Sequence, residues 1–146
     1  MAAQIKVERE FDSTIRLIVE KNKIFSKRTQ FLTFCAHYGF YTNKTLKVSS
    51  DGIDINMRAL EDFNPDILAI ALAEKENIDI LKDEKDYLKI FENYMNGGLK
   101  AIHKIIQKNL STDDDGIRII LDLLHELRNE ISDIEDIEKN LELPDN

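Results

Sequence analysis

Polar and apolar residues alternate near the start of the chain, in the run Gln4-Ile5-Lys6-Val7-Glu8. The apolar positions are β-branched, and a period of two is typical of a half-buried strand. We therefore predict a strand here whose Ile5 and Val7 face the core and whose Gln4, Lys6 and Glu8 face outward.

The period then changes to that of a helix. Asn22 and Lys23 end a first predicted helix, whose apolar residues recur every three or four positions at Phe11, Ile15, Ile18 and Val19. Ser26 is expected to cap a second helix, because its hydroxyl can accept a hydrogen bond from an unpaired backbone N–H. That helix runs through the aromatic-rich segment 31–38 and is expected to stop at Gly39, a residue suited to the left-handed C-terminal cap.

Residues 40–56 are expected to be irregular, with a turn at Asp51-Gly52. Asn64-Pro65 is expected to start a short helix over residues 67–73, and a longer helical pattern begins at about Asp83. Asn96-Gly97-Gly98 interrupts the longer pattern, either at a sharp bend or at a place where another backbone approaches closely.

The last predicted helix opens at Ser111 and the carboxylates of residues 113–115, which favour the positive end of a helix dipole. Its apolar positions run from Ile117 to Ile137, a stripe that could pack on a partner, on a second copy or on the domain itself. Together these elements predict a mostly α fold. It consists of an N-terminal strand-helix-helix unit, ordered as in ribbon-helix-helix proteins, followed by a helical bundle.

A chain of 146 residues has the length of one domain, so residues 1–146 are expected to form a single helical domain. Cys35 is the one cysteine, which excludes an internal disulfide and fits a reducing compartment. The N-terminal residues lack the apolar core of a signal peptide, and no stretch approaches the roughly 20 apolar residues that cross a bilayer. These features predict a cytoplasmic protein that has no membrane partner.

The net charge of −8 is unevenly distributed along the chain. Residues 1–48 hold nine Lys or Arg and four Asp or Glu, a net charge of +5, and the other 98 residues carry −13. The domain is therefore divided into a basic strand-helix-helix part, residues 1–48, and an acidic helical part, residues 57–140. Such asymmetry indicates a basic contact surface beside an acidic body, although charges also cluster by chance in a chain so rich in them.

The titratable residues form no recognisable catalytic or metal-binding motif. His37, His103 and His125 lack a partner at the spacing of known ligand motifs, and a helix start explains the carboxylates of residues 113–115 more simply than a Mg²⁺ site. Cys35 lies between aromatic residues, where a thiol behaves as a small hydrophobe. We expect no enzyme activity, no metal and no cofactor.

The strand-helix-helix order is that of a DNA-binding unit in which two chains pair their strands into a ribbon that enters the major groove. Outward-facing strand residues would then meet base edges, since Gln pairs with adenine and Lys with guanine. The start of the second helix would meet a phosphate with its N–H groups and positive charge. The candidate DNA-binding residues are Gln4, Lys6, Glu8, Ser26, Lys27 and Arg28. The alternative is a plain edge strand with lysines that only solubilise the chain.

Three segments carry a family resemblance: TQFLTFCAHYGF, DILAIALAEKENIDIL and IFENYMNGGLKAI. They resemble the Dnd system-associated accessory proteins, which are encoded beside bacterial DNA phosphorothioation genes. The resemblance covers roughly residues 28–107, and it rests on helix ends and apolar helices rather than on catalytic residues. The most distinctive positions are Gly39-Phe40 and the run from Phe91 through Tyr94 into Asn96-Gly97-Gly98-Leu99.

The order of the N-terminal elements is also similar to that of the E subunit of the same system, which binds DNA. The resemblance implies an auxiliary role in phosphorothioation-dependent restriction of foreign DNA. Two functions are consistent with all these features. The first is an accessory DNA-binding or complex-assembly protein, a homodimer through its strand, whose partners are DNA and other subunits of the defence system. The alternative is an interaction subunit that does not bind DNA and docks through its C-terminal helices or around Gly97-Gly98.

Overall fold

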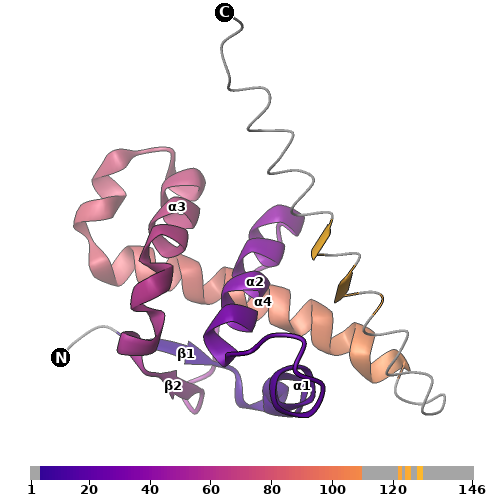
Figure 1. The fold of residues 1–146 in the computed structure, drawn as a ribbon. Helices are drawn as coiled ribbons and strands as arrows, with labels where there is room; N and C mark the ends of the chain where they lie inside the picture. Colours follow the sequence, from indigo (N-terminus) through magenta and orange to yellow (C-terminus); the bar gives the residue numbers. More distant parts are fainter. Residues whose placement is uncertain (1–3, 110–121, 123, 126–127, 130–146) are drawn as a thin grey trace, which may run out of the picture. The chain divides into compact units, whose positions relative to one another are not determined.

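The structure is a computed structural model that describes residues 4–109 together with residues 122, 124, 125, 128 and 129. The chain divides into two units, residues 1–104 and 105–146. All the helices and strands named below lie in the first unit, apart from the C-terminal end of the last helix (Figure 1). The expected helix and apolar stripe over residues 111–137 fall almost entirely outside the described residues.

The described part is mostly helical, and a strand precedes the helices, as the sequence predicted. In chain order the elements are β1 (Ile5–Val7), 3-10 helix η1 (Arg9–Phe11), α1 (Asp12–Ile15), π-helix η2 (Arg16–Lys21), α2 (Arg28–Thr42), β2 (Ile53–Ile55), 3-10 helix η3 (Met57–Phe63), α3 (Asn64–Lys75), 3-10 helix η4 (Ile78–Lys82) and α4 (Glu84–Asn109).

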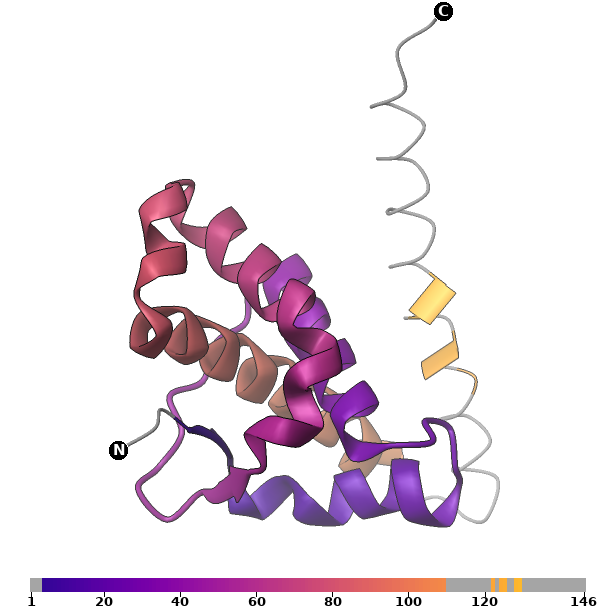
Figure 2. The same cartoon turned by 60° about the vertical axis from the view of Figure 1, so that its left-hand side comes forward.

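The first predicted helix is confirmed as the succession η1, α1 and η2, which forms one continuous helical ribbon in Figure 2. It ends where the sequence indicated. Asn22 closes its last turn, with both its backbone N–H and its side-chain amide donating to the carbonyl of Leu17. Lys23 then takes a left-handed backbone conformation with φ of 51°, and a right-handed helix cannot continue through such a residue.

The predicted boundaries of the second helix were wrong at both ends. Lys27, in extended conformation, is the N-cap residue of α2, and Ser26 lies one residue farther out, where its hydroxyl donates to the side chain of Gln30 at 2.7 Å. The helix continues through Gly39 to Thr42 and stops at Asn43, whose φ is 55°. Asn tolerates this left-handed conformation because its short polar side chain can hydrogen-bond locally.

Gly39 instead serves the contact between α2 and α4, which cross in Figure 1. A Cβ atom on Gly98 of α4 would lie less than 3.0 Å from the carbonyl oxygen of Cys35 and from the backbone nitrogen of Gly39. A Cβ on Gly39 would likewise lie less than 3.0 Å from the carbonyl oxygen of Tyr94. The two helices therefore touch through their backbones, which only residues without side chains allow.

The sequence left open whether Asn96-Gly97-Gly98 is a bend or a close approach, and the structure shows a close approach. α4 runs through all three residues without interruption, so the expected break was wrong. Gly97 lies under the segment that leaves α2, and its Cβ would lie less than 3.0 Å from the carbonyl of Lys44. The chain itself therefore fills the space around these glycines, where an interaction subunit was expected to dock a partner.

β1 is held on both edges within the chain. On one edge it pairs with β2 in antiparallel register, with Ile5 opposite Ile55, Lys6 opposite Asp54 and Val7 opposite Ile53. β2 lies in the segment that the sequence analysis described as irregular. Its Ile-Asp-Ile run is only three residues long, too short for its alternation to stand out from a turn region.

Two side chains of α4 bind the other edge of β1. Glu92 accepts the N–H of Lys6 at 2.9 Å, and the amide oxygen of Asn96 accepts the N–H of Glu8 at 2.8 Å. The Asn96 amide nitrogen donates to the carbonyls of Lys6 and of Glu92, each at 2.9 Å. Both side chains are buried, so these bonds satisfy polar groups that would be costly to leave unpaired.

The core of the first unit gathers apolar side chains from every layer. As predicted, Ile5 and Val7 of β1 face inward and are 0% and 4% exposed. The largest fully buried side chains in this unit include Ile5, Phe11, Ile18, Phe31, Leu60, Ile67, Phe91, Met95 and Leu99.

α3 begins at Asn64-Pro65, with the proline in the first helical turn as predicted, although Phe63 rather than Asn64 is its N-cap residue. Two hydrogen bonds tie it to its neighbours. His37 of α2 pairs with Asp66 at 2.8 Å, and the Tyr94 hydroxyl of α4 donates to Glu74. Burial, with a smaller contribution from Glu74, raises the pKa of Tyr94 to about 12, so this hydroxyl keeps its proton at neutral pH.

His103 links α4 to the first helical segment. Its Nδ1 lies 2.6 Å from the hydroxyl of Thr14, which is 1% exposed, and its ring lies against Phe11 with centroids 4.9 Å apart. Desolvation lowers the pKa of His103 below its ordinary value of 6.5, and the charge of Glu10 only partly opposes this shift.

Substituting Gly98→Ala is expected to destabilise the fold by about 1–3 kcal/mol, the usual cost of overpacking a tight contact. The atoms that the new methyl group meets are backbone atoms, which cannot turn away as a side chain would. This loss exceeds the gain of about 1 kcal/mol that alanine has over glycine in a helix. Urea unfolding followed by circular dichroism measures it, with Lys100→Ala in the same helix as the control. A variant at least as stable as the wild type would contradict the backbone contact.

The shifted pKa of His103 makes stability dependent on pH. Between the lowered folded-state pKa and the ordinary value of 6.5, the unfolded chain binds more protons than the folded chain, so the free energy of unfolding falls as the pH falls. Below the folded-state pKa the loss is complete. Urea unfolding at about pH 7.5 and about pH 5, above and below the ordinary histidine pKa, should show a larger loss of stability for the wild type than for His103→Gln. Equal losses would show that His103 does not contribute.

Candidate functional site

A basic loop joins η2 to α2 and carries the exposed positive charge of the N-terminal part. Lys21 ends η2, Lys23 follows in left-handed conformation, and Lys27 and Arg28 stand at the cap and first residue of α2. All four residues are exposed. Among the described residues, none of these three lysines forms an ion pair.

An ion-pair network fixes the start of α2 to the preceding helical segment. Arg28 lies 2.6 Å from Glu20 and 3.5 Å from Asp12, and Arg16 lies 2.9 Å from the same Asp12. The hydrogen bond from Arg28 holds the pKa of Glu20 below its ordinary value. Exposed ion pairs contribute little stability singly, but shared partners give the two arginines a defined position on one side of the loop.

Aromatic packing anchors the middle of the basic loop. The Phe25 ring lies 5.5 Å from that of Phe31 and 5.4 Å from that of Phe34, centroid to centroid, in tilted geometry. Such pairs stabilise beyond the area they bury. The loop is therefore fastened to α2 at its centre, and its lysines lie on either side of this anchor.

Of the residues proposed from the sequence, the structure brings Ser26, Lys27 and Arg28 together at the start of α2. Ser26 does not cap the helix. Instead the Gln30 side chain reaches back and accepts from the backbone N–H of Lys27 at 3.3 Å as well as from the Ser26 hydroxyl. The Ser26 oxygen is thus exposed in the loop rather than bonded to the helix backbone.

The strand residues proposed to read bases are placed differently. Gln4 is exposed, but the Lys6 ammonium donates to the carbonyl of Ser50 at 3.3 Å. The Glu8 carboxylate accepts the N–H and the hydroxyl of Ser49 at 2.9 and 2.7 Å. The polar ends of Lys6 and Glu8 therefore hold the turn before β2.

The strand pairing that was expected between two chains occurs within one chain in this structure. β2 of the same chain occupies one edge of β1, and Glu92 and Asn96 occupy the other. The likeness to ribbon-helix-helix proteins is therefore limited to the order of the elements. The reason is that the second strand of the sheet comes from the segment after α2, which the sequence pattern did not reveal.

Three residues of this surface were not predicted from the sequence: Arg16, Lys21 and Lys23. They were counted in the positive charge of residues 1–48 but were not placed, because no motif marks them. The available signal was local composition, since residues 13–50 contain seven Lys or Arg and a single acid, Glu20.

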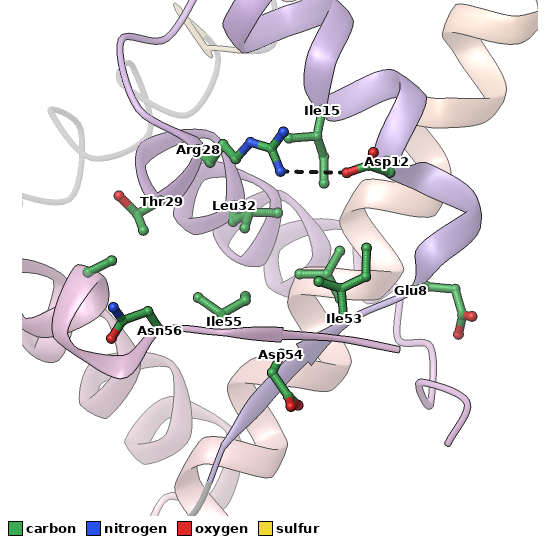
Figure 3. Close-up of a pocket in the computed structure, with 12 residues that line it drawn as sticks. Glu8, Asp12, Ile15, Arg28, Thr29, Leu32, Ile53, Asp54, Ile55 and Asn56 are labelled. Atoms are coloured by element: carbon green, nitrogen blue, oxygen red, sulfur yellow. Dashed lines mark ion pairs between the residues drawn. The ribbon is translucent and has the colours of Figure 1, made fainter. Parts of the chain in front are cut away.

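A pocket of about 220 Å³ lies beside the basic loop, between the start of α2 and β2 (Figure 3). Arg28 and Asp12 form its rim. Its lining is mainly apolar and includes Ile15, Leu32, Ile53 and Ile55.

Among the described residues, Cys35 is buried, and the histidines and acids are dispersed. Burial raises the pKa of the Cys35 thiol well above its ordinary value, which keeps it protonated and unreactive. Across the described residues, no three His, Cys, Asp or Glu side chains gather closely enough to hold a metal ion. None of the described helices combines the length and apolar composition needed to span a membrane.

Comparisons with known proteins place the chain. No curated protein and no solved structure matches it. A family model does match, over residues 4–142, which is nearly the whole chain. The chain therefore belongs to the family described as DNA sulphur modification system-associated protein 4.

Proposed function

We propose that the protein is an accessory DNA-binding subunit of the DNA sulphur modification system, and that it contacts the phosphate backbone through its basic loop. The family description associates it with a system that acts on DNA. The observation that carries the proposal is a group of exposed lysines that form no ion pair with any described residue, Lys21, Lys23 and Lys27, beside Arg16 and Arg28.

Phosphate contact suits this surface better than base reading. Lysines on a short loop present point charges without the fixed geometry that base edges require. The first N–H groups of α2 lie at the same place, and a helix N-terminus favours an anion. Gln4 is the strand residue that remains exposed for a base contact, because Lys6 and Glu8 bind the turn at residues 49 and 50.

The non-catalytic character of the proposal follows from the same residues. The basic loop offers charge and position but no acid–base pair, and the pocket beside it is largely apolar. The protein would therefore help the system to hold its DNA while other subunits perform the chemistry. Docking through the C-terminal helices, the alternative function, concerns residues that lie almost entirely outside the described part.

Fluorescence anisotropy of a labelled duplex tests the proposal at low and moderate salt. We expect binding that weakens steeply as salt rises, since each neutralised phosphate contributes about 0.9 to the slope of log K against log salt concentration. The variant Lys21→Ala/Lys23→Ala/Lys27→Ala should bind at least about tenfold more weakly and lower that slope by up to about 3.

The matched control removes three exposed lysines from the acidic region, as Lys75→Ala/Lys82→Ala/Lys85→Ala, with the same change of net charge. It should keep most of the affinity. Equal losses in both variants would show that only the net charge matters, and an absence of wild-type binding at low salt would overturn DNA contact. Parallel titrations with phosphorothioate-containing and unmodified duplexes would show whether sulphur affects this contact.

A further inference from the structure

β2 has an edge that no described strand covers. Lys6 directs its N–H and C=O to α4, so in the antiparallel ladder Ile5 and Val7 carry the groups that face β2. The partners of these two residues, Ile55 and Ile53, bond back to β1, and Asp54 between them must point its N–H and C=O the opposite way. Within the described part of the chain, no hydrogen bond reaches either group.

The apolar pocket lies directly beside this open edge. Figure 3 shows Ile53 and Ile55 on the pocket side of β2 and Asp54 on the opposite side. The pocket volume of about 220 Å³ is below the roughly 300–1,000 Å³ of sites that enclose a small molecule. It suits one or two apolar side chains delivered by an extended segment.

The charge at the edge defines the occupant. Asp54 is exposed and forms no ion pair among the described residues. Lys6, its neighbour across the ladder, instead binds the carbonyl of Ser50. The other acids of the lining are already engaged, Glu8 by Ser49 and Asp12 by Arg28. The unmatched charge at the strand edge is therefore negative.

We propose that an extended segment of another protein adds to this edge as a third strand, with Lys or Arg beside Asp54 and an apolar residue on each side. Backbone groups of Asp54 supply the hydrogen bonds, and alternation sends the two apolar side chains into the pocket. A second copy of this chain suits the edge poorly, because pairing centred on Asp54 would place two carboxylates opposite each other.

This surface adjoins the proposed DNA contact at Arg28, which also lines the pocket. Asp54 lies outside the basic loop, and its substitutions leave every lysine and arginine of that loop in place. The peptide titrations and the DNA titration of the triple lysine variant therefore test the two surfaces by different measurements.

Two acetylated peptides serve as probes: Ser-Thr-Val-Lys-Val-Thr-Ser and the same peptide with Glu at its centre. Titration into ¹⁵N-labelled protein at low salt should shift the Asp54 amide and slow its hydrogen exchange, because strand addition gives that N–H an acceptor. The Lys peptide should bind about threefold to tenfold more tightly than the Glu peptide.

Two variants separate charge from backbone pairing. Asp54→Lys should reverse the ranking of the peptides. Asp54→Pro removes the outward N–H but leaves the hydrogen bonds between β2 and β1 in place. Edge strands tolerate such a substitution. Both peptides should bind this variant more weakly. An unchanged ranking with Asp54→Lys, or no response of the Asp54 amide at millimolar peptide, would overturn the proposal. A wild-type dimer that Asp54→Pro dissociates would assign the edge to a second copy instead.

Discussion

Backbone contact between α2 and α4 sets the geometry of the first unit. Gly39 on one helix and Gly98 on the other leave no room for a side chain, so the backbones of the two helices lie in contact. At that distance, the face of α4 carrying Glu92 and Asn96 reaches β1 and binds its backbone. A wider spacing of the helices would leave buried polar groups of β1 and α4 unsatisfied, and such groups destabilise more than their hydrogen bonds contribute when made.

This arrangement determines which surfaces remain for a partner. α4 and β2 bind the two edges of β1. The strand that was predicted to contact DNA bases therefore forms its hydrogen bonds within the fold. The exposed edge of the sheet is therefore that of β2, next to the apolar pocket. The exposed positive charge lies on the loop before α2. The two surfaces differ in chemistry: the loop offers exposed lysines, whereas the β2 edge offers backbone groups, which have no partner in the described part of the chain, and the carboxylate of Asp54.

Periodicity in the sequence was sufficient for elements whose stability is local or whose apolar stripe is long. The strand at Ile5–Val7, the first helix up to Asn22 and the helix start at Asn64-Pro65 were all predicted. The errors occurred where tertiary contacts override local preference. Gly39 is typical of a helix end, but a neighbouring backbone requires it in the middle of α2. β2 is stabilised by its pairing with β1. A run of three residues does not indicate that its partner strand lies nearly fifty residues away.

The same contrast explains why the resemblance identified the family better than it identified the function. The positions that carry it are structural: Gly39, Gly97 and Gly98 form the backbone contacts, Asn96 binds β1, and Phe91 is fully buried. Tyr94 packs edge-on against Phe40 at 5.4 Å and bonds Glu74. A run of residues constrained in this way specifies the packing of α2 against α4 and does not define the exterior surface. The lysines of the basic loop and Asp54 of β2 lie outside that run, on loops and edges, which is where a rigid scaffold places its binding residues.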